Sequence, residues 1–175
     1  MERLNILQQL DSRLFISIFA RGGRPTIRYC ARVLSRTAEG YLHILLPLLL
    51  SQLSIGRVNE LITLIAASLV VERVVYWLLK NTLKRRRPQD SLPEFRSLIV
   101  PGDKFSFPSG HTSSAFLLAT ALMVVYQGPV GSVYIWASSI ALSRIVLGVH
   151  YPGDTIAGAL MGSTIVVIMA QLLGV

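Results

Sequence analysis

Long apolar segments separated by polar ones constrain this chain more than any other feature of its sequence. The apolar segments cover residues 38–55, 61–79, 112–126, 130–147 and 155–173. Most of them approach the roughly 20 residues that a helix needs to cross a bilayer. Hydrophobic residues make up 52% of the chain and charged residues 15%, whereas a soluble domain carries about a quarter charged residues. The sequence therefore predicts an all-α integral membrane helical bundle with about five transmembrane helices.

The first 37 residues predict a different arrangement, namely one or two N-terminal amphipathic helices in the membrane interface. Over residues 4–19 apolar side chains recur at helical spacing, but Asp11 falls on the same face and argues against a membrane span. Such a helix suits the interface, and packing onto the bundle is an equally good alternative. The apolar positions are Leu4, Leu7, Leu10, Leu14, Phe15 and Ile18.

A basic stripe marks the second of these helices, which follows the break at Gly22 and Gly23. Its arginines can bind lipid headgroups, and a solvated face is the alternative. We therefore expect a single domain, with interfacial helices over residues 1–37 and a helical core over residues 38–175. The stripe consists of Arg24, Arg28, Arg32 and Arg36, which recur every four residues.

The chain is strongly basic, with a net charge of +8 and a pI of about 10.3. Nucleic acid is the usual partner of such a chain, but here the basic residues flank apolar segments. We therefore expect the partner to be a bilayer with anionic headgroups, and no nucleic acid. The single cysteine, Cys30, excludes an internal disulfide and a cysteine-based metal site. The oligomeric state is left open.

Polar residues gather between the last two apolar segments, over residues 143–154. Polar groups at the edge of a membrane segment are costly and usually functional. Asp154 can accept the N–H of one ring nitrogen of His150, which leaves the other nitrogen free to attack. Arg144 can hold an anionic oxygen of the group that is attacked. The alternative is structural, with Asp154 capping a helix and His150 on a surface loop.

Two earlier motifs favour the functional interpretation. Ser109 can cap the helix of the third apolar segment, Gly110 lets a ligand approach the backbone, and the free N–H groups of a first turn bind anions. His111 lies where it can protonate a leaving oxygen. Lys80 closes the second apolar segment, and Arg87 follows in a loop rich in positive charge.

Together the three motifs resemble the signature of the type-2 phosphatidic acid phosphatase superfamily, as in a small bacterial-type member. That superfamily includes membrane lipid phosphate phosphatases, soluble bacterial acid phosphatases and vanadium haloperoxidases. The resemblance covers about residues 40–175 and implies the same helical core. Larger membrane members have six spans, so the amphipathic N-terminal segment replaces a full first span here. The matching motifs are Lys80-x6-Arg87-Pro88, Pro108-Ser109-Gly110-His111 and Ser143-Arg144-x5-His150-x3-Asp154.

The resemblance implies a metal-independent lipid phosphatase that works through a phosphohistidine. His150 attacks phosphorus, Asp154 orients His150, and His111 protonates the leaving lipid oxygen and then activates water. No metal or cofactor is expected, because only one of the nine carboxylates lies in the motifs and a two-metal site needs several ligands. The residues that hold the phosphate oxygens are Lys80, Arg87, Ser109, Gly110 and Arg144.

The resemblance leaves the lipid open. Small bacterial relatives act on undecaprenyl diphosphate, phosphatidylglycerol phosphate, phosphatidic acid or lipid A, and we favour an isoprenoid diphosphate or phosphatidylglycerol phosphate. The alternative function is lipid binding or lipid transport without catalysis. We expect a multi-pass protein of the cell inner (cytoplasmic) membrane. The surplus of Lys and Arg beside the motifs predicts a cytoplasmic site, against the external face that the resemblance implies.

A few polar residues outside the motifs also carry expectations. His43 is expected to be structural and to pair with Glu39 on one helix face. Glu72 and Arg73, near the middle of an apolar segment, should face the bundle interior and find partners there. We expect simple membrane anchoring from Arg85 and Arg86.

Overall fold

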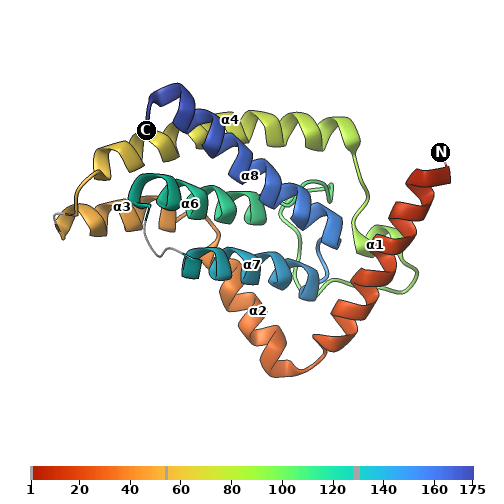
Figure 1. Ribbon diagram of the computed structural model, residues 1–175. Coiled ribbons are helices and arrows are strands. Elements are labelled where there is room, and N and C mark those ends of the chain that lie inside the picture. The colour runs from red at the N-terminus through yellow and green to blue at the C-terminus, as the bar shows by residue number, and fades with distance from the viewer. Residues whose placement is uncertain (1, 54, 128–130) are drawn as a thin grey trace.

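The computed structural model describes residues 2–53, 55–127 and 131–175, and within these ranges all regular structure is helical (Figure 1). The expected all-α class is therefore confirmed. Residues 128–130, which include the start of the predicted 130–147 segment, lie outside the described part. The helices are α1 (Glu2–Arg21), α2 (Pro25–Thr37), α3 (Leu42–Gln52), α4 (Val58–Leu83), the single turn α5 (Pro88–Ser91), α6 (Gly110–Tyr126), α7 (Gly131–Val146) and α8 (Pro152–Leu173).

Helix α6 forms the centre of the bundle, and α4, α7 and α8 pack around it (Figure 1). Most residues of α6 are buried, which explains why its sequence is apolar on all sides. The main cluster of buried side chains joins α4, α6 and α8. Its fully buried members include Leu61, Leu64, Leu117, Leu118 and Val166.

Two glycines of α8 allow that helix to touch the backbone of α6. A Cβ atom on Gly162 would lie 2.2 Å from the carbonyl oxygen of Ser113, and one on Gly158 would lie 2.5 Å from that of Ser109. Small residues at such crossings let helices in a membrane approach closely. The two glycines lie four positions apart, on one face of the helix, and such a spacing favours this contact. As a result the first turn of α6 is held directly against α8.

Two helices are long and apolar enough to cross a membrane, one starting at Val58 and the other being Pro152–Leu173. At 1.5 Å per residue, α4 and α8 measure about 39 and 33 Å, which exceeds the roughly 30 Å of a hydrocarbon core. Helix α3 has 11 residues and measures only about 16 Å. It is therefore much shorter than the predicted 38–55 span, and the number of five spans stays a prediction.

Large apolar side chains cover the outer faces of these helices. A soluble protein rarely exposes such extended apolar surface, whereas lipid chains cover it in a membrane. Representative exposed residues are Leu45, Leu48, Val70, Trp77, Ile135, Ile156 and Leu160.

The two N-terminal helices both pack against helices of the bundle. Helix α1 contacts α7 and α8, and its Phe15 is fully buried against Phe95 and Tyr151. Helix α2 packs on α7 and buries Ala31 and Ser35. Apolar residues of α1 such as Leu7 and Leu10 remain exposed. Helix α1 thus combines the two alternatives that the sequence left open for it, an outward apolar face and a packed one.

All the motifs lie at one end of the bundle (Figure 1). Helices α4 and α7 end there, whereas α6 and α8 begin there. Backbone hydrogen bonds join the two connecting segments, from Leu98 N to Leu147 O at 2.9 Å and from Ser109 N to Asp154 O at 3.0 Å. Helix α1 lies across this end, so the N-terminal segment contributes to the region that contains the motifs.

Candidate active site

A tight turn between α7 and α8 places His150. Gly148 adopts a φ of +80°, which is unfavourable for residues with a side chain, and it reverses the chain directly after α7. The turn brings His150 back beneath the loop that precedes α6, where its exposed fraction is 2%. The imidazole is therefore shielded from bulk solvent and held by surrounding structure.

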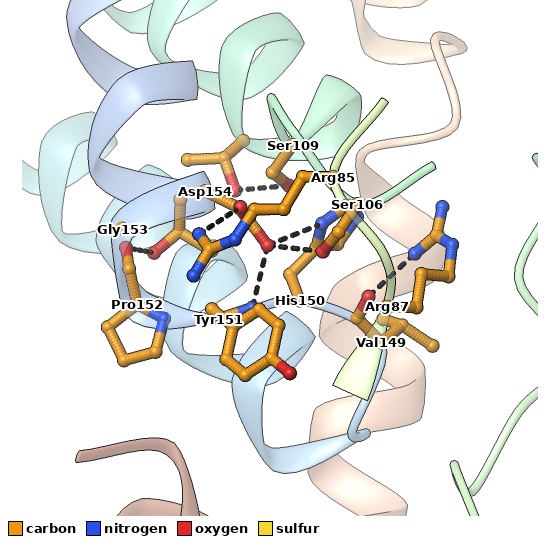
Figure 2. A network of polar contacts seen from close by, with 12 residues as sticks. Arg85, Arg87, Ser106, Ser109, Val149, His150, Tyr151, Pro152, Gly153 and Asp154 are labelled. Carbon is orange, nitrogen blue, oxygen red and sulfur yellow. Dashed lines mark hydrogen bonds and ion pairs between the residues drawn. The ribbon is translucent and has the colours of Figure 1, made fainter. Parts of the chain in front are cut away.

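The predicted partner of His150 lies beside it. The Nδ1 atom of His150 is 3.6 Å from Oδ2 of Asp154, which is longer than a hydrogen bond, and Nδ1 has no hydrogen-bond partner among the described residues. The same carboxylate oxygen accepts the backbone N–H of Tyr151 at 2.8 Å and the hydroxyl of Ser106 (Figure 2). Asp154 is therefore fixed by other donors, with the imidazole a short movement away.

Burial decides the protonation state of His150. Burial disfavours the charged imidazolium and lowers the pKa of His150. The carboxylate of Asp154 raises this pKa, whereas the positive charges of Arg144 and Arg87 lower it further. The outcome is a pKa of about 4. At neutral pH the imidazole is uncharged, so one ring nitrogen offers a lone pair, as a nucleophile requires.

Arg85 holds the other oxygen of Asp154, so its predicted role in membrane anchoring is wrong. Its Nη1 atom lies 2.7 Å from Asp154 Oδ1, and its Nη2 atom lies 2.6 Å from Asp11 Oδ2 on α1. The guanidinium also stacks on the ring of Tyr151, 4.3 Å from its centroid. Asp11 in turn accepts the backbone N–H of Gly153 at 2.8 Å. An ion-pair chain thus connects α1 to the carboxylate beside the histidine.

Nothing in the sequence distinguished Arg85 from its neighbours. It belongs to a run of four basic residues, and such runs usually lie on a solvated or lipid-facing surface. In the sequence Asp11 stands out only as a charged residue on the apolar face of residues 4–19. Its partner lies 74 positions further along the chain, so the pair is visible only once α1 packs across the end of the bundle.

Lys80 and Arg87 converge on a residue that the sequence did not single out, Asp103. Lys80 Nζ lies 2.8 Å from Asp103 Oδ2, and Arg87 Nη2 donates to Asp103 Oδ1. Arg87 also donates through Nη1 to the carbonyl of Val149, at 2.6 Å. That contact ties the cation to the residue before His150. The two predicted phosphate-binding cations therefore lie together, with a carboxylate between them.

The charge of Asp103 is stabilised by this arrangement. Burial by itself raises the pKa of the carboxyl group, but hydrogen bonds from Lys80 and Tyr76 and the charge of Arg87 outweigh burial and lower it to about 2. Asp103 is thus an anion at neutral pH. Its contacts with the two cations are of the kind that a phosphate oxygen can make.

The first turn of α6 supplies the backbone donors of the site. Ser109 is fully buried and occupies the predicted N-cap position, but its side chain makes no capping hydrogen bond to the described backbone, and its Oγ lies 2.9 Å from Oγ1 of Thr112. The N–H groups of Gly110, His111 and Thr112 precede the first intrahelical hydrogen bond, which runs from Ser113 N to Ser109 O. Such free N–H groups attract anions.

Arg144 reaches the site from the last turn of α7. Its exposed fraction is 5%, Nη1 donates to Ser35 Oγ on α2 at 2.6 Å, and Nε has no partner among the described residues. Together with His111 it lines a cavity of about 360 Å³ that opens between α2 and the loop before α6. All the motif residues are therefore brought together, with Ser35 as an addition that the sequence did not reveal.

The remaining polar residues lie along the helices that lead away from the site. His43 is mostly buried and its Nε2 atom lies 3.1 Å from Ser114 O on α6, so it does not pair with Glu39. Glu72 is fully buried, as expected, but its partner is the adjacent Arg73, at 2.6 Å, whose side chain is 54% exposed. Arg73 also stacks on the ring of Tyr76. The hydroxyl of Tyr76 donates a hydrogen bond to the carboxylate of Asp103.

The fold and the site together define a class of protein, a membrane helical bundle with a buried, cation-lined site for phosphate chemistry. The statistical model of the PAP2 superfamily matches residues 59–174. The chain belongs to the PAP2 superfamily, as its motifs indicated.

Relatives of known function support this assignment. The chain is 30% identical over 142 residues to the decaprenylphosphoryl-5-phosphoribose phosphatase of Mycobacterium tuberculosis, covering 81% of this chain and 78% of that protein. It is 41% identical over 63 residues to the lipid A 4'-phosphatase of Bacteroides thetaiotaomicron, covering 35% of this chain and 28% of that protein. The family and these relatives place the chain among lipid phosphatases.

Two solved structures have the same fold. LpxE of Aquifex aeolicus aligns with a TM-score of 0.79 and 28% identity, over 91% of this chain and 93% of that one. A PAP2-type phosphatidylglycerolphosphate phosphatase of Bacillus subtilis aligns with a TM-score of 0.74 and 20% identity, over 97% of this chain and 87% of that one. These similarities confirm the membrane helical bundle.

Proposed function

We propose that this protein hydrolyses a phosphate monoester or diphosphate on a membrane lipid through a phosphohistidine at His150. The observation that carries the proposal is the convergence at one end of the bundle of a buried neutral imidazole, cationic side chains and a helix N-terminus. The cavity lined by His111 and Arg144 gives a lipid headgroup access to this point.

In the first step His150 attacks phosphorus. Asp154 faces Nδ1, so the attacking atom is Nε2, and the P–N bond forms as the P–O bond to the lipid breaks. The electron pair of that bond goes to the lipid oxygen, which takes a proton from His111. As His150 becomes positively charged, Nδ1 and Asp154 draw together from 3.6 Å into a hydrogen bond.

In the second step water replaces the imidazole. His111 accepts a proton from the water molecule, the water oxygen bonds to phosphorus, and the P–N bond breaks. Inorganic phosphate leaves, and His150 is again neutral. Throughout, Lys80, Arg87 and Arg144 and the N–H groups of the first turn of α6 hold the phosphate oxygens. Donors of this kind stabilise a transferring phosphoryl group by several kcal/mol.

Substrate binding requires a rearrangement. In the structure Lys80 and Arg87 both bind Asp103, so a phosphate that uses these cations displaces the carboxylate. Asp103 lies in a loop and its side chain is 40% exposed, which leaves room for it to turn toward solvent.

The proposed chemistry is metal-independent. Both carboxylates of the site are ion-paired with cationic side chains, Asp103 with Lys80 and Arg87, and Asp154 with Arg85. A two-metal mechanism needs carboxylates or histidines that are free to bind the ions, and here the cationic side chains perform the charge neutralisation.

The substrate and the location are also part of the proposal. Named relatives act on decaprenylphosphoryl-5-phosphoribose and lipid A, which supports a large anionic lipid. We favour an isoprenoid diphosphate or phosphatidylglycerol phosphate over phosphatidic acid. The outward apolar faces of the helices support a multi-pass protein of the cytoplasmic membrane with five spans, one of them including the short α3.

The test is phosphate release by the purified chain in neutral detergent, with these lipids as substrates and EDTA present. The wild-type chain is expected to release phosphate, and His150→Ala is expected to release none. His111→Ala is expected to be slower by about 10²–10⁴-fold. Normal turnover by His150→Ala would contradict the covalent mechanism, and activity that needs added Mg²⁺ would contradict metal independence.

A further inference from the structure

The cavity beside the proposed catalytic residues has one strongly basic wall. It holds about 360 Å³, and His111 and Arg144 line its inner part. His150 lies behind them and is almost fully buried. The facing wall consists of Arg32, Ser35 and Arg36 of α2 and of Glu39, which follows the end of that helix.

The two arginines of this wall are held in register with the site. Ala31 and Ser35 are buried against α7, and Ser35 accepts a hydrogen bond from Arg144 at 2.6 Å. Arg32 and Arg36 are one helical turn apart, so both guanidinium groups lie on the same side of α2. The contacts of Ser35 therefore fix where these two cations lie relative to Arg144, which we assign to phosphate binding.

The wall has unused capacity for an anion. Arg32 and Arg36 are exposed and form no ion pair within the part of the chain that the structure describes. The buried Nε atom of Arg144 also lacks a partner there. The acidic residue of the wall, Glu39, accepts a hydrogen bond from the hydroxyl of Tyr41. Positive charge in this cavity thus exceeds what the described residues neutralise.

The position of His111 shows which part of a substrate this wall meets. If His111 protonates the leaving oxygen, as the proposed function requires, the cavity beyond it contains the leaving group. We propose that Arg32 and Arg36 bind a second phosphate group, one that remains on the lipid after hydrolysis. The preferred substrates then carry two phosphates. Attack of His150 on the terminal phosphorus breaks its P–O bond and releases a lipid that keeps the other phosphate, and water then cleaves the P–N bond to give inorganic phosphate.

The same stripe could instead bind the anionic surface of a bilayer, and the two roles make different demands. Surface binding involves Arg24 as much as Arg32 or Arg36, because all belong to the stripe, and it is independent of the substrate headgroup. A subsite for a second phosphate involves only the arginines of the cavity wall. It also distinguishes between substrates that differ only in that phosphate, even in neutral detergent.

The experiment measures kcat/KM of the full chain in neutral detergent for two matched pairs of lipids. One pair is a polyprenyl diphosphate and the monophosphate with the same tail. The other is phosphatidylglycerol phosphate and phosphatidic acid with the same acyl chains. The wild-type chain is compared with the double variant Arg32→Gln/Arg36→Gln, with Arg32→Lys/Arg36→Lys and with the control Arg24→Gln.

We expect the double glutamine variant to lower the two-phosphate to one-phosphate ratio of kcat/KM by about 10-fold or more, because it removes charge-assisted hydrogen bonds. The lysine variant is expected to restore part of the ratio, and Arg24→Gln to retain it. The pair with the larger loss identifies whether the second phosphate is adjacent to the first or further along the headgroup.

Two outcomes would overturn the inference in distinguishable ways. An active wild type whose ratio is unchanged in the double variant, or changes equally in Arg24→Gln, shows that the stripe binds a lipid surface and that no second phosphate site exists. A wild type that releases phosphate from none of the four lipids overturns the proposed function, and this subsite with it. Thermal unfolding of each variant confirms that exposed α2 side chains were changed without loss of the fold.

Discussion

Asp103 offers the sharpest test of how the site receives phosphate. Its carboxylate binds Lys80 and Arg87, the same cations that we assign to the substrate phosphate. A phosphate and Asp103 therefore compete for them. The substitution Asp103→Asn removes the competing charge while keeping the size of the side chain, so we expect inorganic phosphate and substrate to bind more tightly.

The size of the effect follows from the charge stabilisation of Asp103. Its pKa falls from 3.8 to about 2, and at about 1.36 kcal/mol per unit this corresponds to about 2.5 kcal/mol of attraction. Because the side chain is 40% exposed, solvent screening reduces the figure to about 1 kcal/mol. We therefore expect phosphate to bind about fivefold more tightly to Asp103→Asn.

The sign of the pH dependence also follows. A carboxylate with a depressed pKa keeps its charge above the ordinary value near 3.8 and loses it only as the pH falls toward 2. Competition by Asp103 is therefore constant between about pH 5 and pH 8. Over this range the ratio of phosphate affinities between Asp103→Asn and wild type is expected to stay flat.

The assay is the inhibition constant of inorganic phosphate against hydrolysis, with isothermal titration of phosphate as a second measurement. Asp90→Asn is the matched control, because Asp90 is an exposed acidic residue of the same connecting segment. It removes the same charge from a side chain that forms no ion pair with either cation, since both pair with Asp103. Equal or weaker phosphate binding by Asp103→Asn, or an equal gain in Asp90→Asn, would refute competition for Lys80 and Arg87.

Three further outcomes are expected. Arg85→Gln is expected to lower kcat about tenfold or more, because it leaves the buried carboxylate of Asp154, beside His150, without its partner at 2.7 Å. Arg86→Gln changes an exposed neighbour and is expected to have normal kinetics. Equal kcat values for the two variants would contradict a positioning role of Arg85. Because burial sets the pKa of His150 at about 4, the acidic limb of the kcat/KM profile is expected at a pH of about 4, where the imidazole gains a proton, and an acidic limb near 6.5 would contradict a shielded imidazole. Gly162→Ala is expected to lower the thermal midpoint in detergent by several degrees, because its Cβ would lie 2.2 Å from a carbonyl oxygen of α6, whereas Gly131→Ala, with open space around it, is expected to leave the midpoint unchanged.

Much of the fold could be predicted because long apolar runs in a sequence indicate membrane helices. Segments 61–79 and 155–173 correspond to α4 and α8, since a lipid environment requires both internal hydrogen bonding and apolar side chains. The same argument failed for segment 38–55. That segment is equally apolar, but α3 covers only Leu42–Gln52, because apolar composition by itself does not determine where a helix begins or ends.

The motif residues could be predicted as a group because polar and charged side chains next to membrane segments are energetically costly and are usually functional. Arg144, His150 and Asp154 stand out from the apolar residues around them. Short spacings in the chain also limit their separation, so His150 and Asp154 had to lie near one another. The spacing does not determine whether the two side chains form a hydrogen bond, and in the structure Nδ1 of His150 lies 3.6 Å from Oδ2 of Asp154.

The tertiary structure alone decided which other charges belong to the site. Asp11 and Arg85 are 74 positions apart, Ser35 and Arg144 are 109 apart, and no periodic pattern links such pairs. Within the basic run that contains Arg85, and among the arginines of α2, every member has the same intrinsic chemistry. Only the packing of α1 and α2 onto the end of the bundle determines which guanidinium group faces a carboxylate, which faces the cavity and which is exposed elsewhere.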